Sequence, residues 1–430
     1  MIKEFYNVRQ MRLMVLLRKT ISRLLLTKGG GIMNYNAELG KVVFGSRHSL
    51  PGGVFTADAN GNLGQTNDAS TTNRFTLQTF EYQGGIRLTS AVLHDSGDKL
   101  LTNEVNAQME AVLEQQARII NRFIVSTGNC QLCSITGAEV AYAKADAPTG
   151  FNYAIPVVDT SALALGQIVD WYGADNTLVG QVKVIGANTP TGPGSLVVNS
   201  ATALSGNGAG TAYGGFYLQN TSPTMSNPVH GLGDLISDKG WFLTAGEGGF
   251  DRSLDTRVGY RSVVKDGTGN AAPTYELLED LFDDLTMIGG EFADFDGIQR
   301  KMKKITSYFC CHPGVYRALT RSMRGMQHVM DTVEVDPGFS IKAYEGVPIV
   351  REPDVAPGSG FAFKCPDWFN LSMPTKWEPG TDGLFTRGYG TVNNEAVFRS
   401  RLQLFTDNPR NQGKITNIPN STKAAVAYSA

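Results

Sequence analysis

The most regular pattern of apolar and polar positions runs over residues 99–126. The preceding Asp95-Ser96-Gly97-Asp98 offers side-chain oxygens for an N-cap, and Gly128 is placed to end a helix. The apolar residues recur every three or four positions, as one face of a helix requires; they are Leu101, Val105, Met109, Val112, Leu113, Ile120 and Ile124. The pattern therefore predicts a helix about 40 Å long.

Between residues 154 and 227 the pattern changes to short apolar runs without a helical period. The runs at 167–172, 182–185 and 195–198 are separated by turns rich in Gly, Asn and Pro. This spacing predicts a small antiparallel sandwich or barrel inserted into a larger domain. The segment 230–234 marks the expected return to that domain.

Residues 273–405 alternate between helical and strand patterns. We expect helices at 275–288 and after His312-Pro313-Gly314, and a buried strand at 308–311. Shorter strands are expected near 341, 347–350, 361–363 and 369–371. A final strand is expected at 396–405. One side of it would carry Phe398, Ser400, Leu402 and Leu404, and the opposite side the polar residues Arg399, Arg401 and Gln403.

Residues 50–73 are almost entirely Gly, Asn, Asp, Ser and Thr, which predicts a long loop without a core of its own. Two extended strands are expected directly after it, at 74–82 and 86–92, with Gly84-Gly85 between them. An isolated two-stranded arm is marginally stable in water. We therefore expect this arm to lie on a neighbouring molecule.

The composition fits a globular chain with many turns. Of 430 residues 49 are Gly, and only 18% are charged. The formal net charge of −2 argues against a protein that wraps nucleic acid, which would carry a basic stripe. No apolar run has the length needed to cross a bilayer, so no membrane partner is expected.

Residues 1–32 differ from the rest by their basic character. Their only acid is Glu4, whereas the basic residues are Lys3, Arg9, Arg12, Arg18, Lys19, Arg23 and Lys28. One interpretation is a basic amphipathic helix that touches DNA, a scaffold or a membrane. The other is that translation starts at Met33, because codons for residues 28–32 would resemble a ribosome-binding site. No function is assigned to this segment.

Candidate chemistry is sparse. Cys130 and Cys133 form half of a metal motif, and the other clustered candidates are Cys310, Cys311 and His312. Adjacent strand positions point in opposite directions, so buried thiols are the favoured interpretation. A solvated or intersubunit face is the favoured interpretation of a group of acids, Glu276, Glu279, Asp280, Asp283 and Asp284.

Other motifs also favour a protein without catalysis. The segment 206–210 resembles a phosphate loop only in its glycine content and is interpreted as a turn region. No Gly-x-Ser-x-Gly elbow occurs. We expect no catalytic residue, no cofactor-binding residue, no metal ligand and no cofactor.

The order of these elements resembles the major capsid proteins of tailed bacteriophages. Residues 86–96 are similar to the segment that joins the family's extended E-loop to its spine helix, and 126–129 to the break after that helix. Residues 344–350 resemble the axial-domain loop, 398–409 the closing strand, and 166–232 an insertion found in some subfamilies. The resemblance covers about Asn34 to Ile418.

The resemblance implies an α+β capsid fold with an N-arm, an E-loop, a peripheral domain with a long spine helix, an axial domain and an inserted antiparallel β domain. The expected divisions are a basic segment (1–32), N-arm (33–50), E-loop (51–95), peripheral domain with spine helix (96–153), inserted β domain (154–227), a return to the peripheral domain (228–272), axial domain (273–392), and closing strand with C-terminal tail (393–430).

The resemblance also implies a function in assembly. The chain would form pentamers and hexamers of an icosahedral virion head, assembled in the bacterial host cytoplasm with scaffold, portal and decoration proteins as partners. It would touch packaged double-stranded DNA non-specifically, with Arg399 and Arg401 as candidates. Intersubunit contacts are expected at Phe75, Leu77, Phe80, Tyr82, Ile86, Arg87, Tyr344 and Glu345.

One departure from the family concerns covalent cross-linking, which uses an E-loop lysine. No lysine lies between Lys41 and Lys99, so a shell without cross-links is expected. The nearest alternative is an encapsulin-like nanocompartment shell with the same fold. An enzyme with a β accessory domain and a phage decoration or fibre protein are further alternatives. The first would need a catalytic constellation, and the second should lack the long helix.

Overall fold

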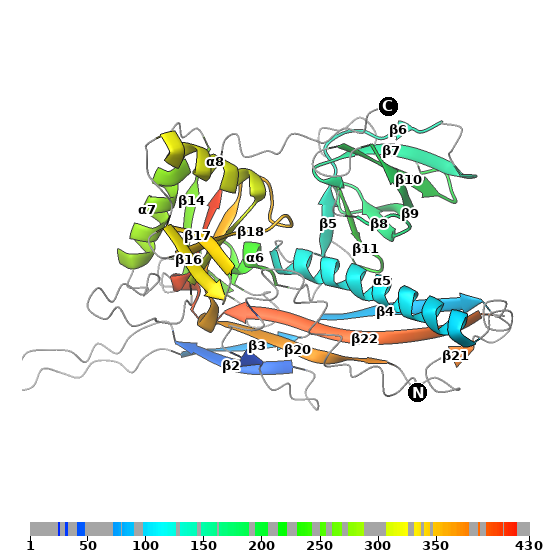
Figure 1. Ribbon diagram of the computed structural model, residues 1–430, viewed down its shortest axis with the longest axis horizontal. Coiled ribbons are helices and arrows are strands. Elements are labelled where there is room, and N and C mark those ends of the chain that lie inside the picture. Colours follow the sequence, from blue (N-terminus) through cyan, green and yellow to red (C-terminus); the bar gives the residue numbers. More distant parts are fainter. Residues whose placement is uncertain are drawn as a thin grey trace, which may run out of the picture.

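In the computed structural model, the described part of the chain forms helices and antiparallel-rich sheets, which confirms the α+β class (Figure 1). The described residues are 25, 31–32, 41–47, 72–78, 80–89, 98–125, 130–143, 148–160, 163–188, 194–204, 214–221, 230–242, 250–254, 260–268, 274–287, 307–325, 331–336, 339–344, 347–377, 386–387, 393–406 and 408–418.

A long helix on a long sheet forms the middle of the molecule. Helix α5 (Asp98–Val125) confirms the predicted helix, and it begins where the N-cap sequence ends. The sheet has β22 (Asn393–Thr406) at its centre. Antiparallel to β22 run β4 (Phe80–Thr89), β20 (Trp368–Trp377) and β21 (Thr386–Arg387), and β1 (Gly31–Ile32) adds to β20 in parallel.

One end of α5 leads directly into a seven-stranded antiparallel sheet, drawn at the upper right of Figure 1. Its order is β5-β11-β8-β9-β10-β7-β6. The strands are β5 (Gln131–Ser134), β6 (Val140–Ala141), β7 (Phe151–Val157), β8 (Ile168–Tyr172), β9 (Leu178–Ala187), β10 (Gly194–Ser200) and β11 (Gly215–Leu218). We call this sheet the β domain; it begins earlier in the chain than residue 154.

The second lobe, at the left of Figure 1, packs two helices against a mixed seven-stranded sheet. The helices are α7 (Thr274–Met287) and α8 (Pro313–Gly325). The strand order is β14-β23-β19-β15-β18-β17-β16. These strands are β14 (Val263–Asp266), β15 (Ser307–Cys311), β16 (Asp331–Asp336), β17 (Phe339–Tyr344), β18 (Val347–Arg351), β19 (Gly360–Lys364) and β23 (Gly413–Thr416).

The expected two-stranded arm is corrected by the structure. Gly84 and Gly85 make no turn, because β4 passes through them and pairs with β22 from residue 80 to residue 89. The ladder to β22 supplies the backbone hydrogen bonds that a turn would forgo. The ribbon is instead β2 (Lys41–Arg47) with β3 (Thr72–Gln78), in register from Lys41↔Gln78 to Arg47↔Thr72.

Short elements complete the chain. They are α6 (Leu232–Leu235), the strand pair β12 (Trp241–Phe242) and β13 (Phe250–Asp251), and the 3₁₀ turns η4 (Cys365–Asp367) and η5 (Pro409–Asn411). From the basic N-terminal segment, Leu25 is 3% exposed and joins the core beside the long sheet. The remaining N-terminal residues up to Gly30, and 206–210, lie outside the described residues.

Candidate functional site: the polar junction at the end of the long helix

The last turns of α5 join the long sheet to the β domain. Phe123 is fully buried and meets Phe80 of β4 edge to face, with ring centroids 6.1 Å apart. Both rings belong to a core that continues through Cys130 and Leu132 into the β domain. Ile120 and Ile124 enter a different core, formed with Trp368 and Phe405 around the long sheet. The helix end is therefore fixed in two cores.

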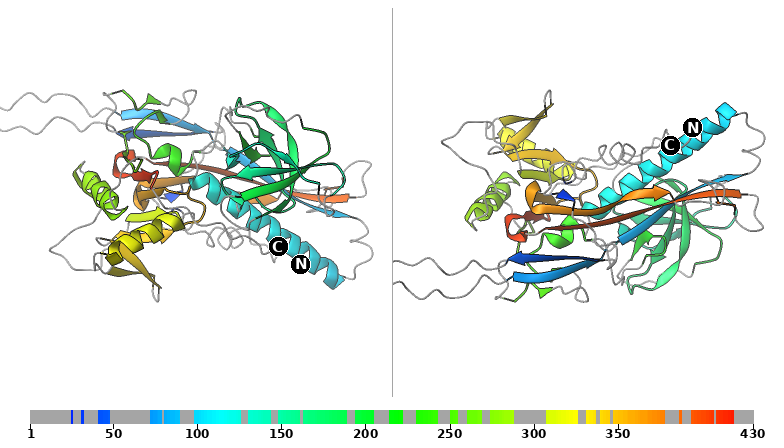
Figure 2. Two further views of the ribbon diagram at one scale, coloured as in Figure 1. Left: turned by 90° about the horizontal axis from the view of Figure 1, so that it is seen from above. Right: turned by 90° about the horizontal axis from the view of Figure 1, so that it is seen from below.

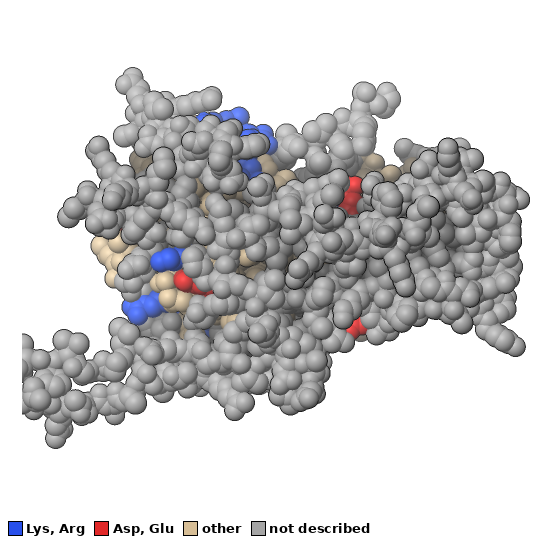
Figure 3. Space-filling view, turned by 60° about the horizontal axis from the view of Figure 1, so that its bottom comes forward, with Lys and Arg blue, Asp and Glu red and all other residues tan. Residues whose placement is uncertain are grey.

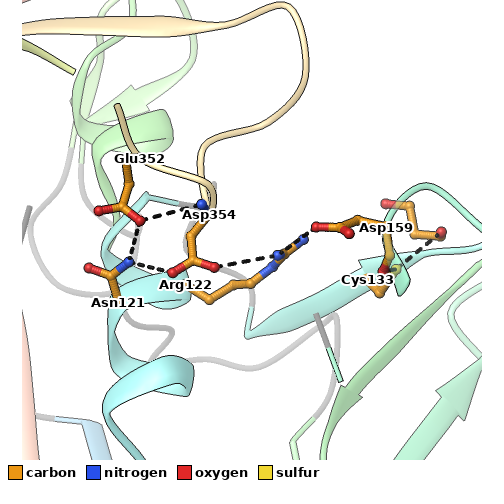
Figure 4. A network of polar contacts seen from close by, with 7 residues as sticks. Asn121, Arg122, Cys133, Asp159, Glu352 and Asp354 are labelled. Carbon is orange, nitrogen blue, oxygen red and sulfur yellow. Dashed lines mark hydrogen bonds and ion pairs between the residues drawn. The ribbon is translucent and has the colours of Figure 1, made fainter. Parts of the chain in front are cut away.

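Arg122 joins three stretches of chain at this helix end. One guanidinium nitrogen, Nη1, lies 3.3 Å from Asp159 Oδ2, just beyond β7 of the β domain. The same nitrogen lies 3.9 Å from Asp354 Oδ1, in the loop after β18 (Figure 4). The three side chains are only 14–18% exposed, so the pairs are partly shielded from solvent.

Asn121, the preceding residue, reaches the same loop and is fully buried. Its Nδ2 donates to Glu352 Oε1 over 3.3 Å and to Asp354 Oδ2 over 2.5 Å. Glu352, 1% exposed, also accepts from the backbone N–H of Asp354. A buried carboxylate needs such donors, so the helix end and the β18 loop specify one relative placement. We call Asn121, Arg122, Asp159, Glu352 and Asp354 the junction.

A cavity of about 280 Å³ lies beside the junction, lined in part by Arg122, Cys133 and Lys414. Cys133 donates through Sγ to the backbone oxygen of Asp159 over 3.2 Å, and burial raises the pKa of its thiol. Lys414 donates from Nζ to the backbone oxygen of Gly233, and burial lowers the pKa of its ammonium. A thiol kept neutral is a poor nucleophile, and the two hydrogen bonds tie Cys133 and Lys414 to neighbouring backbone.

Further along α5 the helix and the β domain separate. A groove of about 710 Å³ lies between β4, α5 and one end of the β domain, with Gln83, Gln115 and Gln219 among its walls. Contact between the helix and the β domain is thus concentrated at the C-terminal end of α5.

A second anchor, which sequence reasoning missed, holds the chain as it leaves the β domain. Arg252 is 1% exposed and donates to the backbone oxygens of Leu235 and Asp234, each over 2.9 Å. Burial lowers the pKa of its guanidinium to about 10. His230 donates its backbone N–H to Gln403 Oε1 over 2.9 Å, and its Nδ1 lies 2.9 Å from Asp234 Oδ2. No local sequence signal marks an arginine that bonds backbone oxygens.

The predicted intersubunit residues fall into separate places. Phe75 and Leu77 lie on β3 of the ribbon, while Tyr82, Ile86 and Arg87 lie on β4. Phe80 is 4% exposed and packs on Phe123 of its own chain, which leaves little of its ring for a neighbour.

The remaining two candidates were expected in the axial domain. Tyr344 is half-buried at the end of β17, with its ring 6.1 Å from that of Phe282. Glu345 lies outside the described residues.

Arg399 and Arg401, the predicted DNA-facing residues, both lie on β22. Their partners across to β4 are Gln83 and Glu81. Their side chains are not among those the structure describes, so contact with DNA stays a prediction. On the face drawn in Figure 3, the described lysine and arginine side chains form small separate groups.

The described part of the chain contains no group of three or more His, Cys, Asp or Glu side chains placed to hold a metal ion. All five cysteines are buried. Among the described helices, none combines the length and apolar character of a membrane span.

No protein-family model matches the chain, and no curated protein matches it. Solved structures align with nearly the whole chain at low sequence identity. The cyanophage A-1(L) capsid aligns with a TM-score of 0.48 and 11% identity, covering 95% of this chain and 92% of that chain. The holo-SrpI encapsulin complex from Synechococcus elongatus gives 0.44 and 9%, with the same coverages.

The capsid of the native GTA particle aligns with a TM-score of 0.44 and 8% identity, covering 92% of this chain and 90% of that chain. Because the identities are this low and each TM-score is below 0.5, the function proposed below rests on this chain's own geometry.

Proposed function

We propose that this chain is the building block of a protein shell, the major capsid protein of a tailed bacteriophage. Its copies form the hexamers and pentamers of an icosahedral head that encloses the genome. Scaffold, portal and decoration proteins are its partners, it touches packaged double-stranded DNA without sequence preference, and it assembles in the host cytoplasm. Its role is structural and not enzymatic.

The observation that carries this proposal is the β2–β3 ribbon. The two strands pair with each other and, within the described residues, with no further strand. A two-stranded ribbon of seven residues a side is marginally stable in water. A neighbouring subunit offers the surface that such a ribbon needs, and the neighbour's ribbon then covers the next copy in turn. Phe75 and Leu77 would contribute to this contact.

The remaining geometry supports the same function. A helix of 28 residues on a sheet whose central strand has 14 residues forms a stiff beam between two lobes (Figure 1). The β domain meets this beam at the junction. A shell subunit must keep its shape while weak contacts are repeated over many copies, and a beam held in two cores provides that stiffness.

Sedimentation velocity of the full chain tests the proposal. We expect a large fraction in particles of many subunits, with smaller rings in equilibrium at low concentration. A second expression from Met33 measures whether residues 1–32, which include the buried Leu25, are needed for that assembly. A chain that sediments as a monomer at every concentration would contradict the proposed function.

A further inference from the structure

Helix α7 presents an acidic face to solvent. It contains five carboxylates, and neither lysine nor arginine occurs within Thr274–Met287. Glu279, Asp280 and Asp283 are exposed, opposite the buried Leu278, Leu281 and Leu285. Asp284 is paired with Lys265 of β14 over 2.7 Å. The three exposed carboxylates, which we call the acidic face, form no ion pair within the described part of the chain.

Helix α8 presents the opposite charge. Its sequence, Pro313–Gly325, holds three arginines and no acid. Arg317 and Arg321 are exposed, opposite the buried Val315 and Leu319.

Two further cations extend this surface around the ring of Tyr316. The guanidinium carbon of Arg351 lies 4.7 Å from the ring centroid, and Lys342 Nζ lies 6.0 Å from it. An aromatic ring between cations keeps their side chains ordered. Arg317, Arg321, Lys342, Arg351 and Tyr316 are called the basic face.

Both faces place like charges at a spacing that does not stabilise a helix. Glu279 and Asp283 are four residues apart, as are Arg317 and Arg321, and like charges at that spacing repel. Asp283 also lies near the C-terminal end of α7, where the helix dipole favours cations. Opposite charge supplied from outside the chain would offset these costs.

Within the described residues the two faces do not pair with each other. Helices α7 and α8 are fixed by the same core, which includes Leu281 and Leu319. Among the described residues no ion pair joins the two helices. In Figure 2, α7 lies at one end of the molecule and α8 along an adjoining side. The two helices therefore lie on different sides of the subunit.

We propose that the acidic face of one copy of this chain docks on the basic face of the next copy. Such a contact joins two different surfaces, so it is heterologous, and repetition about one axis closes a ring. The inference rests on the proposed function, since it names the contact that links subunits within a ring of the shell. Charge complementarity sets the order and orientation of neighbours.

Reciprocal charge reversal in the full chain tests the contact. Arg317→Glu with Arg321→Glu, or Glu279→Arg with Asp283→Arg, places like charges across the interface. We expect each pair to lower the assembled fraction at least tenfold in sedimentation velocity, and the fourfold combination to restore most of it. A matched reversal elsewhere, Arg118→Glu with Lys183→Glu on exposed positions of α5 and β9, should leave assembly unchanged. Circular dichroism verifies that each variant is folded.

A second measurement uses a variant that is expected to assemble, so it detects the contact inside the particle itself. Arg317→Lys with Arg321→Lys keeps the charge and adds amines, so a carbodiimide can couple them directly to carboxylates. In particles mixed from isotopically light and heavy subunits, we expect peptides that join α8 of one subunit to α7 of another.

Two results would overturn the inference while leaving the shell proposal intact. One is that the wild-type chain forms particles and the charge-reversed variants assemble equally well. The other is that cross-linked peptides from the particles never join α8 to α7. Binding of double-stranded DNA to the basic face in place of α7 would produce the second result. If the wild-type chain forms no particles at all, the proposed function itself has failed.

Discussion

Arg122 of α5 lies 3.3 Å from Asp159 of the β domain, which ties the long helix to a lobe that follows it in the chain. The same side chain also lies near Asp354 of the other lobe. One residue therefore links three parts of the molecule, and replacing it should weaken the contacts among all three.

Arg122→Met removes both ion pairs and leaves two partly buried carboxylates without their cation. We expect a loss of about 1–3 kcal/mol in the free energy of unfolding, between the values for exposed and fully buried pairs. Thermal unfolding followed by circular dichroism measures it. Arg118→Met, four residues earlier on the exposed side of α5, is the control and should change stability by less than about 0.5 kcal/mol. Equal effects of the two substitutions would contradict a role for the junction.

Phe123→Ala tests how firmly the helix end is held in the core of the β domain. The fully buried ring packs on Phe80, and its removal leaves a cavity, so we expect a loss of about 3–5 kcal/mol. Phe151→Ala makes the same chemical change at a ring that is 47% exposed, and should have a much smaller effect in the same denaturant titration. A small loss at Phe123 would show that this contact does not anchor the helix.

Gly360→Ala tests the packing of β19 against β15. A Cβ there would lie 2.5 Å from Cζ of the buried Phe309 and 3.1 Å from Cβ of Cys311. Since both neighbours are enclosed, we expect a loss of about 1–3 kcal/mol from overpacking. Gly186→Ala is the control, because the nearest atom there is 3.8 Å away. Thermal midpoints that agree for the two variants would argue against this packing.

The thiols of Cys310 and Cys311 should resist alkylation in the native chain. Burial raises the pKa of both above the ordinary 9.0, so the thiolate is scarce at pH 8. Iodoacetamide followed by mass spectrometry should find both unmodified until the chain is unfolded. The unfolded chain loses these protons near pH 9 and the folded chain keeps them, so their contribution to stability falls as pH rises above 9. Rapid labelling at pH 8 would contradict their burial.

The sequence predicts those helices and strands in which burial sets the spacing of the apolar residues. The stripe from Leu101 to Ile124 predicts α5, and the apolar run at 308–311 predicts β15, because burial of one face or of both faces leaves a period in the sequence. The ribbon was assigned wrongly because Gly84-Gly85 favours a turn locally, while the pairing of β4 with β22 is a long-range relationship. The junction could not be predicted, since Asn121, Asp159 and Glu352 are brought together only by the fold.

The central claim is that many copies of this chain close into a shell. Negative-stain electron microscopy of the purified full chain, followed by a cryo-electron reconstruction of its particles, tests it most directly. We predict closed icosahedral particles in which each β2–β3 ribbon lies on a neighbouring subunit. Isolated single subunits, or particles in which each ribbon lies only on its own chain, would contradict it.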